Sequence, residues 1–137
     1  PDLSLADALS RILSPFVLGA AADQCGVRLH LREMIEPSSV YAQTVGQSIK
    51  PQHDMMARLL AKHIGLAQPD DDVHRLVFAI IAMAHDYCMS QEFMKIVAPR
   101  LISSPGALPR ALSRMVEWSV ALVEHERRRH AQPDATA

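Results

Sequence analysis

Histidine and cysteine are the residue types in this chain that could hold a metal ion, and two of them stand at a suitable spacing. His85 and Cys88 are three positions apart, so on a helix they would lie on one side, as two ligands of a zinc site can. The run HERRR at 125–129 is close to the HExxH motif of zinc proteases, but Arg129 occupies the place of the second histidine. These fragments do not complete a site, and a small buried thiol is the simpler interpretation of Cys88.

No complete catalytic motif of the common kinds occurs in the sequence. There is no Glu-x-x-His pair of a di-iron bundle, no Gly-x-Ser-x-Gly, no phosphate-binding loop and no dinucleotide glycine fingerprint. We therefore expect that the chain is not an enzyme and uses neither a cofactor nor a metal.

Three charged residues, Arg32, Glu33 and Glu36, stand among apolar ones in the segment HLREMIEPSS, residues 30–39. In one interpretation, Arg32 and Glu33 point between helices and orient a ligand in an internal cavity. In the other, they pair with each other or with a neighbouring helix and brace the packing. A buried charge without a partner is very costly, so either role requires a partner group.

Composition indicates a single helical domain. The chain has 137 residues, 14 Lys+Arg against 15 Asp+Glu, and only 4% aromatic residues. This balance of charge gives no electrostatic attraction to nucleic acid or to an anionic membrane. The longest apolar run covers residues 76–84, whereas a membrane-spanning helix needs about 20 residues. With two cysteines and no signal segment, we expect a cytoplasmic location.

The spacing of apolar residues predicts five to six helices with kinks. Pro15 is expected to kink the first helix or divide it, and Pro51 to interrupt a later one. Ser38 or Ser39 can cap the third helix, and Gly65 is a good residue to end the fourth. The expected helices cover residues 5–20, 26–35, 39–49, 51–64, 72–97 and 109–130.

The two last helices have distinct signals. Three aspartates, 70–72, meet the positive end of the helix over 72–97, which is apolar nearly all round in its first half and needs partners on both sides. Residues 98–109 read as a loop. The arginines 127–129 favour the negative end of the last helix, where they form a solvated cap rather than a phosphate contact. Residues 131–137 read as a disordered tail.

Three segments resemble the C-terminal ligand-binding and dimerisation domain of TetR-type transcriptional regulators, in particular the CecR-like branch. They are HLREMIEPS (30–38), IKPQHDMMARLLAKHIGL (49–66) and DDDVHRLVFAIIAMAHDY (70–87). The resemblance implies an effector-binding and dimerisation domain over residues 1–130. TetR-type proteins read operator DNA through an N-terminal helix-turn-helix domain, and this chain has no basic recognition helix of that kind. We therefore expect the chain to sense and to dimerise without reading DNA itself.

The resemblance strengthens the expectation of an apolar effector pocket whose walls come from several helices. Methionines such as Met55 suit an adaptable wall, although methionines at helical spacing are more often plain core. The candidate ligand-binding residues are Phe16, Arg32, Glu33, Tyr41, His53, Met56, Phe78, Met83 and Tyr87.

The resemblance also implies a homodimer in which the two last long helices form a four-helix bundle with their copies. Small residues at such an interface allow close approach of the helices. The candidate interface residues are Ala79, Ala82, Ala84, Ser119, Leu122 and Val123. The expected partners are a second copy of the chain and a small, largely apolar effector, with no membrane. The alternative is a stand-alone helical module for protein association that binds no ligand.

Overall fold

The computed structural model describes residues 3–19 and 24–132, and every regular element in these ranges is helical, which confirms the all-α class. The long helices α1, α2, α4, α5 and α8 account for the predicted five to six, and the shorter elements are added to them. In chain order the elements are α1 (Leu5–Leu18), α2 (Gln24–Ile35), α3 (Ser39–Thr44), the π-helical turn η1 (Val45–Ile49), α4 (Lys50–Ile64), α5 (Asp71–Met89), α6 (Gln91–Val97), α7 (Arg100–Ser103) and α8 (Ala107–Ala131).

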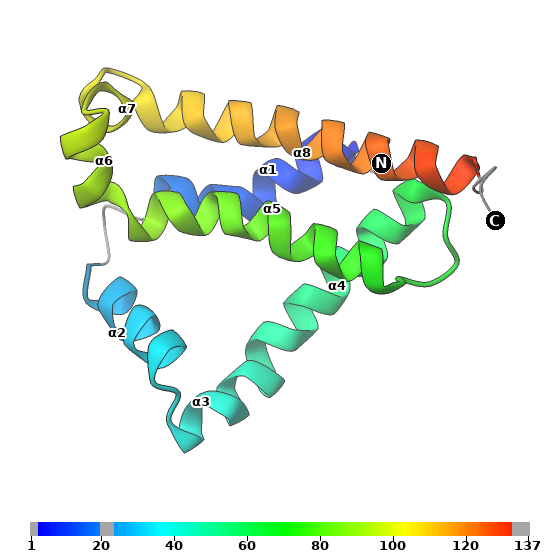
Figure 1. Cartoon of the computed structure of the whole chain (residues 1–137), viewed down its shortest axis with the longest axis horizontal. Coiled ribbons are helices and arrows are strands. Elements are labelled where there is room, and N and C mark those ends of the chain that lie inside the picture. Colours follow the sequence, from blue (N-terminus) through cyan, green and yellow to red (C-terminus); the bar gives the residue numbers. More distant parts are fainter. Residues whose placement is uncertain (1–2, 20–23, 133–137) are drawn as a thin grey trace.

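The core lies where α1, α5 and α8 pack along one another, with the second half of α4 against them (Figure 1). We call α1, α5 and α8 the layer. Their apolar residues recur every three or four positions, so each helix turns one stripe toward the others. Leu9, Leu13, Ile80 and Met115 have at most 1% of their surface exposed. Burial of a side chain of this size contributes roughly 1.5–3 kcal/mol.

A second region, residues 24–55, consists of α2, α3, η1 and the start of α4, and we call it the arm. In Figure 1, α2 and α3 lie away from the layer, and α4 runs from α3 back to it. The α2–α3 turn forms at the predicted cap, because the Ser38 hydroxyl accepts a hydrogen bond from the Tyr41 N–H. α4 ends as predicted at Gly65, whose φ of 95° is in the left-handed region.

The turn η1 has a local cause in Pro51. Proline has no N–H and its ring collides with the carbonyl four residues earlier, here that of Gln47. Just before it the chain forms a π turn, in which the Lys50 N–H donates to the Val45 carbonyl five residues back. The predicted interruption is therefore present as a widened turn within a continuous run of helix. Pro15, by contrast, stays inside α1, which continues to Leu18.

The expectation of one helix over residues 72–97 is wrong, because α5 ends at Met89 and α6 begins at Gln91. Between them, Ser90 has φ −109° and ψ 15°, in the sparsely populated bridge region. Its hydroxyl donates to the Asp86 carboxylate at 2.6 Å, one of the local side-chain bonds that compete with a continuing helix. The expected loop at 98–109 likewise contains α7 and the first turn of α8.

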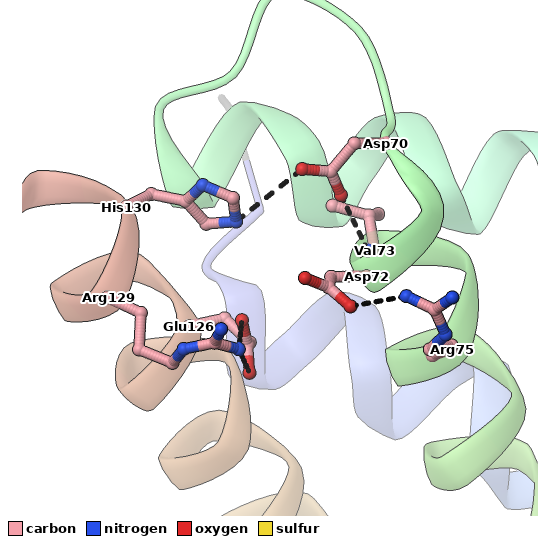
Figure 2. Close-up of polar contacts among 7 residues, drawn as sticks. All are labelled: Asp70, Asp72, Val73, Arg75, Glu126, Arg129 and His130. Carbon is pink, nitrogen blue, oxygen red and sulfur yellow. Dashed lines mark hydrogen bonds and ion pairs between the residues drawn. The ribbon is translucent and has the colours of Figure 1, made fainter. Parts of the chain in front are cut away.

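The start of α5 meets the end of α8, as Figure 2 shows. Asp70, the first of the three aspartates, caps α5: one carboxylate oxygen accepts from the Val73 N–H at 2.9 Å, and the other lies 3.6 Å from His130 Nε2. Arg129 pairs with Glu126 one turn earlier in α8, and Asp72 pairs with Arg75 in α5 (Figure 2). The other arginines of the expected basic cap, Arg127 and Arg128, lie against Glu124. The three arginines thus form ion pairs with glutamates of their own helix.

Residues 133–137 of the predicted tail lie outside the described residues. Within the described part of the chain, none of the helices has the combination of length and apolar character that crossing a bilayer requires.

Candidate functional site

Two pairs of histidines join α5 to the arm. Toward the start of α5, His53 Nε2 of α4 lies 2.8 Å from His74 Nδ1, and the His53 ring also lies against Phe78, with centroids 4.9 Å apart. Toward the end of α5, His30 Nε2 of α2 lies 3.2 Å from His85 Nε2. The His85 ring meets the edge of Phe16 from α1, with centroids 5.4 Å apart.

Each histidine pair depends on the protonation of its rings. In such a contact one ring nitrogen donates and the other accepts, so at least one of the two rings must be neutral. Burial, and after it the charge of His74, lowers the pKa of His53, although Asp54 acts in the opposite direction. Burial and then His30 lower the pKa of His85. His53 and His85 are therefore neutral at pH 7, and both pairs can form.

Many apolar side chains of the arm are not covered by the rest of the chain. Ile35 of the arm is 71% exposed, and Phe78 of α5 is 68% exposed. Exposed apolar side chains that gather in one region are typical of interaction or ligand sites. The exposed large apolar residues of the arm are Leu29, Leu31, Met34, Ile35, Val40, Ile49 and Met55.

The charges of the segment 30–39 have local roles in the structure. The Glu33 carboxylate accepts hydrogen bonds from the Ser38 N–H at 3.0 Å and the Ser38 hydroxyl at 2.9 Å. These two bonds, the N–H first, lower the pKa of Glu33. Glu33 thus braces the turn between α2 and α3, which is the second of the two roles considered for it. Arg32 and Glu36 are exposed.

The remaining candidate ligand-binding residues are not gathered in one place. Met56 belongs to the buried core, and Met83 packs against that core from α5. Tyr41 is half-buried in α3. Tyr87 lies near the end of α5, in the wall of a pocket that α5 forms with α7 and α8. Phe16, His53 and Phe78 are the candidates that the two histidine clusters contain.

His30 and His74 are the residues of these clusters that sequence reasoning missed. Their partners lie 55 and 21 positions away, so no local spacing signals the contacts. The spacing of His85 and Cys88 is realised on α5. Within residues 3–19 and 24–132, however, no group of three or more His, Cys, Asp or Glu side chains is arranged to hold a metal ion.

The candidate dimer residues divide into two sets. Ala84, Ser119 and Val123 are buried inside the chain's own core, and the Ser119 hydroxyl donates to the Met115 carbonyl at 2.7 Å. The second set is exposed on the sides of α5 and α8 that are not buried in the core, where it can meet another molecule. It consists of Ala79, Ala82 and Leu122.

Trp118 belongs on the same outer face of α8 but was not among the candidates. Its side chain is 48% exposed one turn before Leu122, and the Arg114 guanidinium lies 5.3 Å from its ring centroid. An exposed tryptophan is among the residue types that most often carry binding energy at protein interfaces. The residue type together with the helical spacing to Leu122 could have identified it.

Comparison with known proteins gives a match over most of the chain. The family model described as "HTH-type transcriptional dual regulator CecR, C-terminal domain" matches residues 1–121. The matched range contains every candidate effector residue and both histidine pairs. No curated protein and no solved structure gives a match. The family is one of domains of transcription regulators rather than enzymes, as the sequence predicted.

Proposed function

This chain belongs to the CecR C-terminal domain family, and from that premise we propose that it is the regulatory half of a TetR-type transcriptional repressor, binding a small, largely apolar effector and forming a homodimer. Operator DNA would be reached through an N-terminal helix-turn-helix domain of a longer protein. Such a regulator would act in the cytoplasm, beside the DNA. The observation that carries the proposal is the set of uncovered apolar side chains on the arm and on the facing part of α5.

The proposed effector site lies between the arm and α5, around Phe78 and the His53–His74 pair. Phe78 supplies an exposed aromatic face, and Met55 on α4 a second apolar surface. The neighbouring histidines provide polar groups that could orient a ligand, as the few polar groups in apolar pockets do. A ligand that prefers one placement of α4 against α5 would shift the population toward that placement, and thereby change the geometry of the dimer.

The effector site can be tested with a fluorescent apolar probe and a matched pair of variants. Phe78 and Phe93 are 68% and 67% exposed, but Phe93 lies on α6, outside the proposed site. Phe78→Ala is expected to weaken binding of anilinonaphthalene sulfonate about ten-fold, the effect of losing one central aromatic contact. Phe93→Ala should leave the affinity unchanged. Titrations of both variants with the probe measure these affinities. An equal loss of affinity in the two variants would contradict a site at Phe78.

The proposed dimer uses exposed residues of the layer, Ala79 and Ala82 on α5 and Trp118 and Leu122 on α8. Stable interfaces bury on the order of 1,600 Å2 in total, with aromatic residues enriched and charged ones depleted at the centre. Alanines on α5 would let the two copies approach closely, and the tryptophan would supply a large apolar contact.

Leu122→Glu is expected to convert the dimer to a monomer, because it would place two symmetry-related carboxylates in an apolar interface. Sedimentation gives the mass directly. Trp118 is the single tryptophan of the chain, so its emission should also shift to longer wavelength as the interface opens to water. Ile96→Glu on α6 is the control, since Ile96 is 83% exposed on a helix outside the proposed interface. An unchanged dimer mass for Leu122→Glu would contradict the proposed interface.

A further inference from the structure

The end of α5, α7 and the start of α8 meet at one corner of the layer (Figure 1). A pocket of about 220 Å3 lies there. Its walls come from α5, from α7 and from the first turn of α8, with no contribution from the arm. The lining residues are Tyr87, Arg100, Leu101, Ser104, Ala107 and Arg110. The pocket is therefore distinct from the proposed effector site.

Arg110 is held at this pocket by neutral groups. Its Nη1 donates to the Pro105 carbonyl at 2.7 Å, and its Nη2 donates to the Ser104 hydroxyl at 3.0 Å. The Ser104 hydroxyl in turn donates to the Arg100 carbonyl at 2.5 Å. Gly106, with φ 68°, permits this arrangement, since a Cβ at that position would come within 3.1 Å of Arg110 Nη1. The guanidinium is thus ordered before any ligand arrives.

The positive charges at the pocket are not balanced by carboxylates. Among the ion pairs formed within residues 3–19 and 24–132, neither Arg100 nor Arg110 takes part. A guanidinium has five N–H donors, and Arg110 directs only two of its groups to the loop. Arg110 also lies in the first turn of α8, where the helix dipole favours an anion rather than a cation. An anion in the pocket would relieve this unfavourable arrangement.

We propose that this pocket binds a small oxyanion, a phosphoryl or carboxylate group, between Arg100 and Arg110. Planar guanidinium groups match the paired oxygens of both anions. The volume is below the roughly 300–1,000 Å3 of pockets for drug-sized ligands, which fits a small ion or the anionic end of a metabolite. Because Arg100 lies on α7 and Arg110 on α8, an anion there would tie α7 to the start of α8.

The test measures the binding of two probes, inorganic phosphate and malonate, to the 137-residue chain by isothermal titration calorimetry in a buffer free of other oxyanions. Arg100→Ala is the decisive variant, because the Arg100 side chain forms no hydrogen bond to the loop within the described residues and its loss leaves the loop bonds of Arg110 in place. Its dissociation constant is expected to rise about ten-fold or more, as for loss of one charge-assisted contact. Arg58→Ala removes an equal charge from the exposed surface of α4 and is the control.

Binding of phosphate alone would assign the pocket to a phosphoryl group, and binding of malonate alone to a carboxylate. Binding of both with similar affinity would support a general oxyanion site. Arg110→Ala should also weaken binding, and circular dichroism shows whether that variant keeps its helices. Equal losses in Arg100→Ala and Arg58→Ala would overturn the proposal, because the attraction would then be to overall charge. Absence of binding of either probe at millimolar concentration would overturn it as well.

Discussion

The layer and the arm contain similar apolar residues, but these side chains are buried in the layer and exposed in the arm. In the layer, Leu13 and Ile80 are completely buried, whereas in the arm Ile35 is 71% and Val40 67% exposed. Both regions are helical. The difference is in their neighbours: α1, α5 and α8 pack along one another, while α2 meets the layer only sparsely, through α5. Burial in this chain is thus decided by helix arrangement, and composition alone does not reveal it.

The comparison implies that the two regions differ in stability as well as in burial. A segment with few buried contacts opens at a lower free energy than the core around it, and ligand-binding segments are drawn from such parts of a protein. The arm is held to α5 by two histidine contacts and to itself by the bonds of Glu33 with Ser38. An effector that covers its apolar side chains would therefore stabilise it most.

The largest expected difference between the regions is in large-to-small substitutions. Leu13→Ala should lower the free energy of unfolding by about 2–5 kcal/mol, because it leaves a cavity in a buried site. Ile35→Ala should change it by less than about 0.5 kcal/mol, as surface substitutions do. Urea denaturation of the two variants measures both values. A loss at Ile35 as large as that at Leu13 would show that the arm is covered in solution, for example by a second copy.

Two glycines allow a finer comparison at the backbone. Gly65, at the junction of α4 with the layer, has φ 95°, which costs a residue with a side chain about 1–2 kcal/mol. Gly65→Ala should therefore be destabilising, although no atom lies within 4 Å of the added Cβ. Gly46 in η1 has equally open space and no positive φ. Gly46→Ala should raise stability by up to about 1 kcal/mol, since alanine favours helix. Thermal unfolding followed by circular dichroism distinguishes the two signs.

The smallest expected effect is a dependence of stability on pH through His53 and His85. Their folded-state pKa values lie below the ordinary 6.5, so near that pH the unfolded chain binds more protons than the folded one. Stability is then full above about 6.5 and declines as the pH falls toward the lowered values. Replacing His85 by Gln should flatten this decline between pH 7 and 5. Denaturant midpoints across that range are the measurement, and an unaltered slope would contradict the role of the pair.

Sequence reasoning was most accurate where the cause of a feature is local. The cap at Ser38, the start of α5 at the three aspartates and the end of α4 at Gly65 follow from residues within a few positions, and all three are confirmed. The break at Ser90 was not predicted, because the apolar pattern continues across it into α6. The Ser90 hydroxyl donates a hydrogen bond to Asp86 at the break, and the spacing of apolar residues carries no information about such a bond.

Long-range features could not be predicted in the same way. The histidine pairs depend on where α2 and α4 cross α5, which no short pattern records. Periodicity also finds an apolar stripe without saying what covers it. Ala84 and Ala82 illustrate this, since both were candidates for the dimer, yet Ala84 meets the chain's own core and Ala82 faces outward. The assignment requires the complete arrangement of the helices.

The widened turn before Pro51 has a consequence for the direction of the arm. A regular α-helix rotates by about 100° per residue, and a π turn accommodates one additional residue. The number of residues in Val45–Ile49 therefore determines how far α3 is rotated about the axis of α4. Removing one of them would swing α3, and with it α2, around the axis of α4. The His30 ring would then point away from His85, so a change of one residue in length would redirect the exposed apolar side chains of α2 and α3 without altering any of them.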